Sequence, residues 1–221
     1  MSHNITIEGG TSVRLLTAGK YCDQDIVVTA TGGSGGGGGA NQLDELISGT
    51  ITSINSNVDS IDQYACANKF NITSVNVPNA TSIGNYAFQY CKALTSVNAP
   101  NATTVGQYSF RSCTSLKSIK LPSLTTISSS CFYTCTALEK VDLGAPKTID
   151  SQVFYGCSTL ATLIVRKTGS ITTISSNSLP SGFAGNIYVP AELLDSYKTA
   201  NRWSTHADRI FAIEDYPDIC G

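Results

Sequence analysis

The sequence predicts an α/β repeat solenoid with short parallel strands, a small N-terminal β module and an α/β C-terminal cap. The first observation is a 22-residue period, in which phenylalanine, cysteine and leucine each recur in four successive copies. The second is a branched aliphatic column with the same period, which adds a fifth, degenerate copy at the front. Because independent columns share one period, each unit must bury its apolar face against its neighbours. The predicted repeat core is Phe88, Cys91, Leu94, Phe110, Cys113, Leu116, Phe132, Cys135, Leu138, Phe154, Cys157 and Leu160.

Each unit has two halves, which residues 105–122 show most clearly. Residues 105–113 place their apolar side chains on one side, which predicts a short helical or 3₁₀ turn. Residues 118–121 alternate apolar and polar side chains and end before Pro122, which predicts a short strand. Ile119 and Leu121 are expected to point inward, and Ser118 and Lys120 outward.

The segments before the repeats predict three further parts. Residues 1–31 contain strand-forming segments at 4–7 and 25–29 with glycine turns between them, which predicts a small β module. That module is too small for a large core, so we expect it to dock on an assembly or to oligomerise. Residues 32–41 are rich in glycine and predict a flexible linker. Residues 42–60 are predicted to cap the first repeat, beginning with helical turns at 42–47.

The array itself is predicted to occupy residues 61–166 as five repeat units of 22 residues. After Val165 the period decays, and residues 167–215 predict a degenerate repeat followed by the C-terminal cap. In that cap, 186–190 and 209–213 are strand candidates, and the intervening segment has an apolar face that includes Tyr197 and Trp203. Residues 216–221 form a tail.

Composition and charge exclude several classes of function. The chain has 221 residues, 14% of them charged, and a formal net charge of −2, so nothing favours nucleic acid or an anionic membrane as a partner. No stretch is long and apolar enough to span a membrane, and the first residues do not resemble a secretion signal. We therefore expect a protein that is made in a cytoplasm and either stays there or leaves without a standard secretion signal.

The cysteines and histidines do not form a reactive constellation. Four of the eight cysteines fall in the repeat core, where a small apolar side chain packs well, and we expect free thiols there. The remaining cysteines lack metal-ligand spacing, so no metal or cofactor is expected. His3 and His206 lie in separate modules with no nucleophile or paired carboxylates nearby. The sequence therefore predicts no catalytic residues and no enzyme.

The clearest repeat unit, residues 83–100, reads Ile-Gly-x-x-Ala-Phe-x-x-Cys-x-x-Leu-x-x-Val-x-x-Pro. It resembles the BspA-like form of the leucine-rich repeat family, which occurs in many bacterial surface proteins. The first copy departs from this pattern, with Cys66 in place of phenylalanine and Lys69 in place of cysteine. The N-terminal segment that contains 15–22 and 25–28 resembles short modules of tailed-phage and prophage structural proteins.

The outward positions of the five strands are the candidate binding face. They change from neutral to charged to apolar along the array while the inward positions stay aliphatic. Repeat proteins commonly bind partners on such a surface, although ordinary solvated surface is the alternative. The candidate binding residues are Ser74, Asn76, Ser96, Asn98, Ser118, Lys120, Lys140, Asp142, Thr162 and Ile164.

A second column contains Tyr64, Tyr86 and Tyr108. Tyrosines are common at interfaces, but they also cover the apolar edge of their own turn, and the second interpretation is favoured here.

These observations predict a non-enzymatic module that binds protein or glycan. The resemblances imply a phage or prophage virion accessory, at the tail or capsid, anchored to its assembly through residues 1–31. The solenoid would then contact a host cell-surface protein or glycan. The alternative is a bacterial cell-surface adhesin of the BspA-like type.

Overall fold

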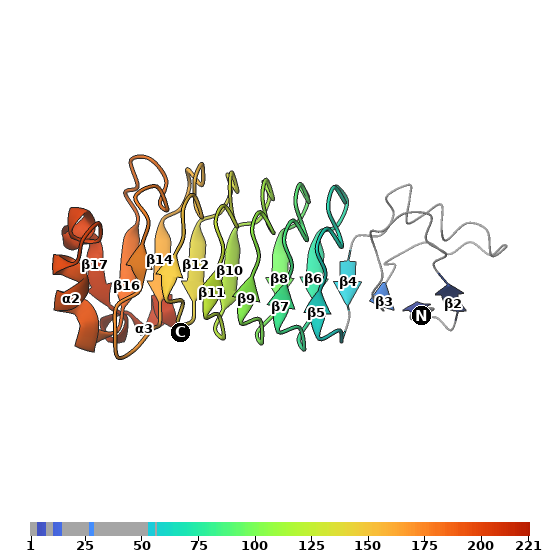
Figure 1. The fold of residues 1–221 in the computed structure, drawn as a ribbon, viewed down its shortest axis with the longest axis horizontal. Helices are drawn as coiled ribbons and strands as arrows, with labels where there is room; N and C mark the ends of the chain where they lie inside the picture. Colours follow the sequence, from blue (N-terminus) through green and yellow to red (C-terminus); the bar gives the residue numbers. More distant parts are fainter. Residues whose placement is uncertain (1–3, 8–10, 15–26, 29–52, 56) are drawn as a thin grey trace.

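The computed structural model describes residues 4–7, 11–14, 27–28, 53–55 and 57–221. It confirms the predicted parallel-strand solenoid: successive strands lie side by side along the long axis of the molecule (Figure 1). The predicted linker at 32–41, the helical turns at 42–47, His3 and Cys22 lie outside the described residues.

One set of strands forms two sheets along the face that carries the candidate binding residues. The first sheet contains, in spatial order, β3 (Val27–Val28), β4 (Ser53–Asn55), β6 (Ser74–Asn76) and β8 (Ser96–Asn98). The second contains β10 (Ser118–Leu121), β12 (Lys140–Leu143), β14 (Thr162–Val165), β16 (Asn186–Val189) and β17 (Ile210–Ala212). All pairs are parallel except β3 with β4. The β4–β6 pair extends the stack to Ser53.

A third sheet, which the sequence did not predict, runs along another face. It contains β5 (Ser60–Ile61), β7 (Ser82–Ile83), β9 (Thr104–Val105), β11 (Thr126–Ile127), β13 (Thr148–Ile149) and β15 (Thr173–Ile174), all parallel. The branched aliphatic column therefore lies in strands that pair across turns, where β-branched side chains pack well.

The predicted helical or 3₁₀ turn is not formed in the regular repeats. Two residues in each turn have a left-handed backbone, for example Tyr86 with φ 60° and Tyr90 with φ 61°, and a helix cannot continue through them. Their N–H groups donate instead to carbonyls one turn ahead, Tyr86 to Gln107 at 2.9 Å and Tyr90 to Arg111 at 2.8 Å. These bonds between turns satisfy the backbone without a helix.

The core is a set of stacked columns, as the period predicted. The rings of Phe88, Phe110, Phe132 and Phe154 stack with centroids 5.3, 5.3 and 5.7 Å apart. Each thiol of the cysteine column is free and buried and donates to a backbone carbonyl of the turn before, at 3.0–3.2 Å. Burial raises the pKa of Cys91 to about 12 and that of Cys135 well above its ordinary range. These thiols fill space and are poor nucleophiles.

The C-terminal end of the stack is closed by η1 (Ala191–Leu193), α2 (Leu194–Thr199) and η2 (Ser204–Arg209). Tyr197 and Trp203 are fully buried, as their apolar spacing predicted. The Trp203 Nε1–H donates to the Thr172 carbonyl at 2.6 Å, and the Thr172 N–H donates to the Tyr197 hydroxyl at 2.8 Å. These bonds fasten the cap to the last turn.

At the other end, β1 (Asn4–Ile7) and β2 (Thr11–Arg14) pair as an antiparallel ladder. None of the described helices is long and apolar enough to cross a membrane.

Candidate functional site: a cleft in the outward face

Within each of the two sheets, the strand register aligns the candidate binding residues in two columns, and we call all ten residues together the ribbon. Ser118, Lys140 and Thr162 are aligned in one column, and Lys120, Asp142 and Ile164 in the other. The same alignment holds in the first sheet, where Ser74 pairs with Ser96. A repeat of constant length therefore places outward side chains of successive turns directly beside one another.

The part of the ribbon on β6 and β8 is open to solvent. Ser96 and Asn98 are exposed, and Ser74 and Asn76 are partly exposed. The Asn98 Nδ2–H donates to Asn76 Oδ1 at 2.6 Å, so the two amides form a short ladder. This half presents neutral hydrogen-bonding groups to a partner.

The part of the ribbon on β12 and β14 is covered by the chain itself. After η3 (Ile213–Asp215), the final helix α3 (Pro217–Cys220) lies against these strands, and the C-terminus returns to the middle of the solenoid (Figure 1). Ile164, Tyr188 and Cys220 form a small buried cluster there. As a result the outward residues Asp142 and Ile164 are only 2% and 0% exposed.

An ionic network holds this covering segment in place. Arg166 donates to both carboxylate oxygens of Asp142, at 2.7 and 2.9 Å, and this pairing raises the pKa of the guanidinium. Arg166, Lys140 and Lys120 donate to three successive carbonyls of the segment: those of Cys220, Ile219 and Gly221 respectively. The sequence analysis did not single out Arg166, because the contacts that define its role lie 24 and 54 residues away.

A cleft of about 270 Å³ separates the open half from the covered half. It lies where β8 ends the first sheet and β10 begins the second, so the ribbon is interrupted at this place. Val97 is half-buried there, although its counterparts Val75 and Ile119 are buried. Five of the ten candidates line the cleft: Ser96, Ser118, Lys120, Lys140 and Asp142. The other five, Ser74, Asn76, Asn98, Thr162 and Ile164, lie outside it.

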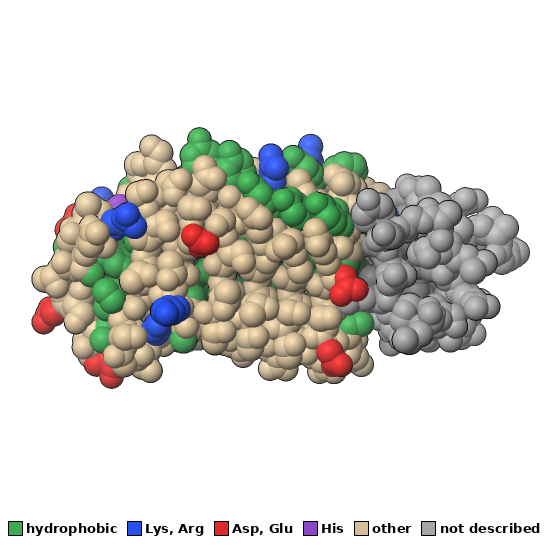
Figure 2. All heavy atoms as spheres, viewed as in Figure 1, with side chains coloured by type: hydrophobic (Ala, Val, Ile, Leu, Met, Phe, Trp, Pro, Cys, Tyr) green, Lys and Arg blue, Asp and Glu red, His purple; other side chains and the backbone are tan. Residues whose placement is uncertain are grey.

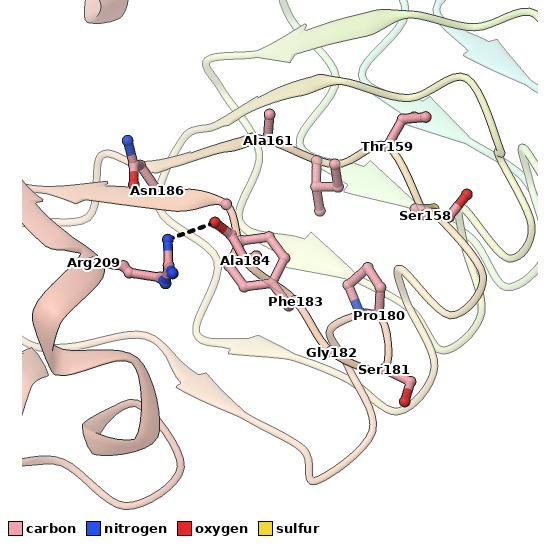
Figure 3. A pocket seen from close by; sticks show the side chains of 13 residues that line it. Ser158, Thr159, Ala161, Pro180, Ser181, Gly182, Phe183, Ala184, Asn186 and Arg209 are labelled. Carbon is pink, nitrogen blue, oxygen red and sulfur yellow. Dashed lines mark hydrogen bonds between the residues drawn. The ribbon is translucent and has the colours of Figure 1, made fainter.

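A second pocket, of about 480 Å³, lies between the last regular turn and the next one (Figure 3). Thr162 is aligned with Asn186, and the same register places Ala184 opposite the core Leu160 of the preceding turn. The methyl group of Ala184 fills less space than the leucine of a regular turn. Arg209 lies at the wall and donates to the Ala184 carbonyl at 2.8 Å.

The described residues contain no group of three or more His, Cys, Asp or Glu side chains that could hold a metal ion. His206 is half-buried, with its ring edge-on to Phe183 at 5.5 Å, and burial lowers its pKa.

The chain matches the model of one known protein family. The model of the BspA type leucine rich repeat region matches residues 46–95 and 81–200, in six copies. The chain belongs to this BspA-type leucine-rich repeat family. The match covers the predicted array and most of the C-terminal cap, so this leucine-rich repeat protein carries its family signature in the solenoid.

Three solved structures are similar to this leucine-rich repeat protein. A leucine rich cell surface protein from Faecalibacterium prausnitzii is 29% identical over 53% of this chain and 32% of its own, with a TM-score of 0.46. A T. pallidum leucine rich repeat protein is 15% identical over 72% and 76%, with a TM-score of 0.41. A leucine-rich repeat protein from Bacteroides ovatus is 20% identical over 63% and 43%, with a TM-score of 0.36. The chain thus spans about a third of the Faecalibacterium protein. A search of curated proteins found no match.

Proposed function

We propose that the protein is a non-enzymatic recognition module whose ribbon binds a protein or glycan of a bacterial cell surface. The observation that carries the proposal is the cleft between β8 and β10, because it gathers five outward residues that the repeat pattern had already selected. Its lining combines hydroxyls and a half-buried Val97 with Asp142 and two lysines that also hold the C-terminal carbonyls, which suits a polar ligand with a small apolar contact.

The family supports this proposal. BspA-type leucine-rich repeats have an extended repeating surface, and one similar structure is described as a cell surface protein. Repeat solenoids use such surfaces for binding, and weak individual contacts gain strength when many copies act together. A shallow cleft of this size is compatible with weak, multivalent contact.

We further propose that the setting is a phage or prophage virion, with the protein at the tail or capsid. The support is the resemblance of the N-terminal residues to modules of phage structural proteins. Residues 1–31 would hold the assembly or form a homo-oligomer, and residues 32–41 would act as the tether. The second candidate is a cell-surface adhesin, which the Faecalibacterium relative favours.

The ribbon is tested by filling the cleft without disturbing the covering segment. Ser96→Trp with Ser118→Trp places two large side chains at exposed cleft positions that make no contact with the C-terminal carbonyls. The matched control is Thr104→Trp with Thr126→Trp, which alters exposed positions on β9 and β11. Binding of the labelled full chain to bacterial cells should fall at least about tenfold in the cleft variant only. Equal binding by both variants would show that the cleft is not the site.

The setting is tested separately. Purified virions from a lysate of the producing strain should contain the protein in stoichiometric amounts by quantitative mass spectrometry. Detection on intact producing cells by surface protease treatment, with none in virions, would support the adhesin instead.

A further inference from the structure

One edge of the solenoid carries a column of aromatic side chains, which we call the aromatic edge. Tyr64, Tyr86 and Tyr108 stack with centroids 4.7 and 5.2 Å apart, and Tyr133 stacks on Tyr155 at 4.9 Å. Tyr108 meets Tyr133 edge-on at 6.5 Å, which joins the two stacks. The aromatic edge consists of these five tyrosines with Tyr90 and Phe70. Figure 2 shows apolar side chains gathered along the upper side of the molecule, beside Lys or Arg side chains.

The edge is apolar, yet two of its seven side chains are exposed and the other five are half-buried. Phe70 and Tyr155 are 54% and 44% exposed, and they are the exposed large apolar side chains of the described part of the chain. Both lie in the same kind of segment, between a strand of the third sheet and the next ribbon strand. An exposed apolar patch that follows one edge of a repeat protein marks an interaction surface.

Cations are held directly on these rings. The Arg111 guanidinium lies 5.4, 5.3 and 5.5 Å from the ring centroids of Tyr90, Tyr108 and Tyr133. Its Nε is buried and has no hydrogen-bond partner among the described residues. Lys92 Nζ lies 5.9 Å from the Phe70 ring. These contacts fix positive charge among aromatic surfaces.

The middle of the edge is positive in a chain that is negative overall. The segments 68–71, 89–93, 111–115 and 133–137 contain Lys69, Lys92 and Arg111 but no aspartate or glutamate, the exposed Asp62 lies at the end of the edge beside Tyr64, and the whole chain has a formal net charge of −2. The three cations lie on three successive turns. Charge complementarity therefore favours an anionic partner that extends along the solenoid axis.

The backbone conformation shows that tyrosine is not required by the turn. Tyr64, Tyr86, Tyr90 and Tyr108 have φ between 55° and 61°, which is unfavourable for a bulky residue. Other turns place Asn68, Ser112 or Gly156 at the position of Tyr90. Stacking within the column offsets part of this cost. The tyrosines at these left-handed positions are therefore not explained by the backbone of the turn.

The nature of the edge also indicates the class of partner. The N–H groups of Tyr86, Tyr90 and Ser112 already donate to the next turn, so an extended peptide cannot pair with this backbone as an added strand. Recognition must use ring edges, hydroxyls and cations. Tyrosine hydroxyls and ring edges suit sugar rings, while lysine and arginine suit their carboxylate or sulfate groups.

We propose that the aromatic edge is a second binding surface that takes a linear acidic glycan lying along the solenoid axis. The glycan's anionic groups pair with Lys69, Lys92 and Arg111, and its sugar rings rest on the edges of the tyrosine column. Neighbouring rings occupy the inner faces of the stacked tyrosines, so face-on stacking of a sugar falls to the exposed rings of Tyr155 and of Phe70, on the side of Phe70 away from Lys92. This surface is separate from the ribbon and does not depend on it.

The test is titration calorimetry of the full chain with polymers of defined charge. Polygalacturonate presents carboxylates, dextran sulfate presents sulfates, and unmodified dextran is neutral. Binding of either anionic glycan, weakened by added salt, with no binding of dextran is the expected result. The comparison of carboxylate with sulfate identifies the preferred acidic group.

The decisive variant is Lys69→Gln with Lys92→Gln, since both lysines are exposed and their loss should not affect folding. Affinity should fall at least about fivefold. The control, Lys147→Gln with Lys167→Gln, removes the same charge away from the aromatic edge. Lys147 lies between β12 and β13 and Lys167 between β14 and β15, so affinity should be unchanged. Arg111→Gln should weaken binding further, with its melting temperature measured in parallel.

Three outcomes would overturn the proposal. An equal loss of affinity in Lys147→Gln with Lys167→Gln would mean that glycan binding depends only on the net charge of the chain. Binding of poly-L-glutamate as tightly as polygalacturonate, with the same sensitivity to Lys69→Gln and Lys92→Gln, would assign the edge to acidic peptides. Loss of polygalacturonate binding in the Ser96→Trp and Ser118→Trp variant would place the glycan on the ribbon instead.

Discussion

The two halves of the ribbon are made by the same repeat but differ in what covers them. On β6 and β8 the outward residues are neutral and at least partly exposed, and the Asn98 side chain donates to that of Asn76. On β12 and β14 the equivalent positions, Asp142 and Ile164, are buried under the C-terminal segment. The repeat fixes where outward side chains lie, but not whether they remain available. The cleft lies at the boundary between these two halves.

The largest predicted effect is a loss of stability at high pH, and it tests whether the two halves of the ribbon share one core. Burial raises the pKa of Cys91 from its ordinary value of 9.0 to about 12, and raises that of Cys135 in the same direction. The folded state thus keeps protons that the unfolded chain loses above pH 9. Stability should be complete below pH 9 and fall as pH rises toward 12.

Urea unfolding at pH 7, 9 and 10.5 measures this loss of stability. In Cys91→Ala and in Cys135→Ala, the free energy of unfolding should fall less steeply with rising pH. If only one of the two variants shows a weaker dependence of the free energy of unfolding on pH, the cores behind the two halves of the ribbon differ.

The next effect is specific to the covered half. Asp142→Ala leaves Arg166 without its carboxylate partner and should lower the free energy of unfolding by about 2–3 kcal/mol, since Arg166 is partly exposed. Chemical denaturation measures the change. A loss below about 0.5 kcal/mol would mean that the ionic network does not hold the C-terminal segment.

A smaller effect is expected when the covering segment is removed. A chain that ends at Tyr216 loses the buried contacts of Ile219 and Cys220 and should be destabilised by about 1–2 kcal/mol. Lys120 and Lys140 should then react faster with an amine-acylating reagent, as followed by mass spectrometry. Unchanged reactivity of both lysines would contradict the coverage described here, and exposed Lys147 provides the reference rate.

The smallest effect lies in the open half. Asn98→Ala removes one exposed side-chain hydrogen bond to Asn76 and should change stability by less than about 0.5 kcal/mol. Unfolding under the same conditions as Asp142→Ala gives the direct comparison. A loss as large as that of Asp142→Ala would show that the open half is structural and not a free binding face.

The sequence predicted the core more accurately than the turns. The phenylalanine column, the buried thiols and the inward orientation of Ile119 and Leu121 follow directly from the period, and the structure confirms them. The helical turn was wrong, because left-handed residues such as Tyr86 and Ser112 give no distinctive signal in composition. The third sheet was missed because its strands are only two residues long.

The sequence by itself determined the fold and the candidate ribbon, because burial repeated at a fixed interval imposes the register of every turn. Only the tertiary structure decided which part of that ribbon is accessible. The decisive contacts join Lys120 to Gly221 and Lys140 to Ile219, 101 and 79 residues apart. Such contacts occur once and carry no period. A pattern that repeats reveals what all turns share, whereas a single long-range contact is visible only once the chain is folded.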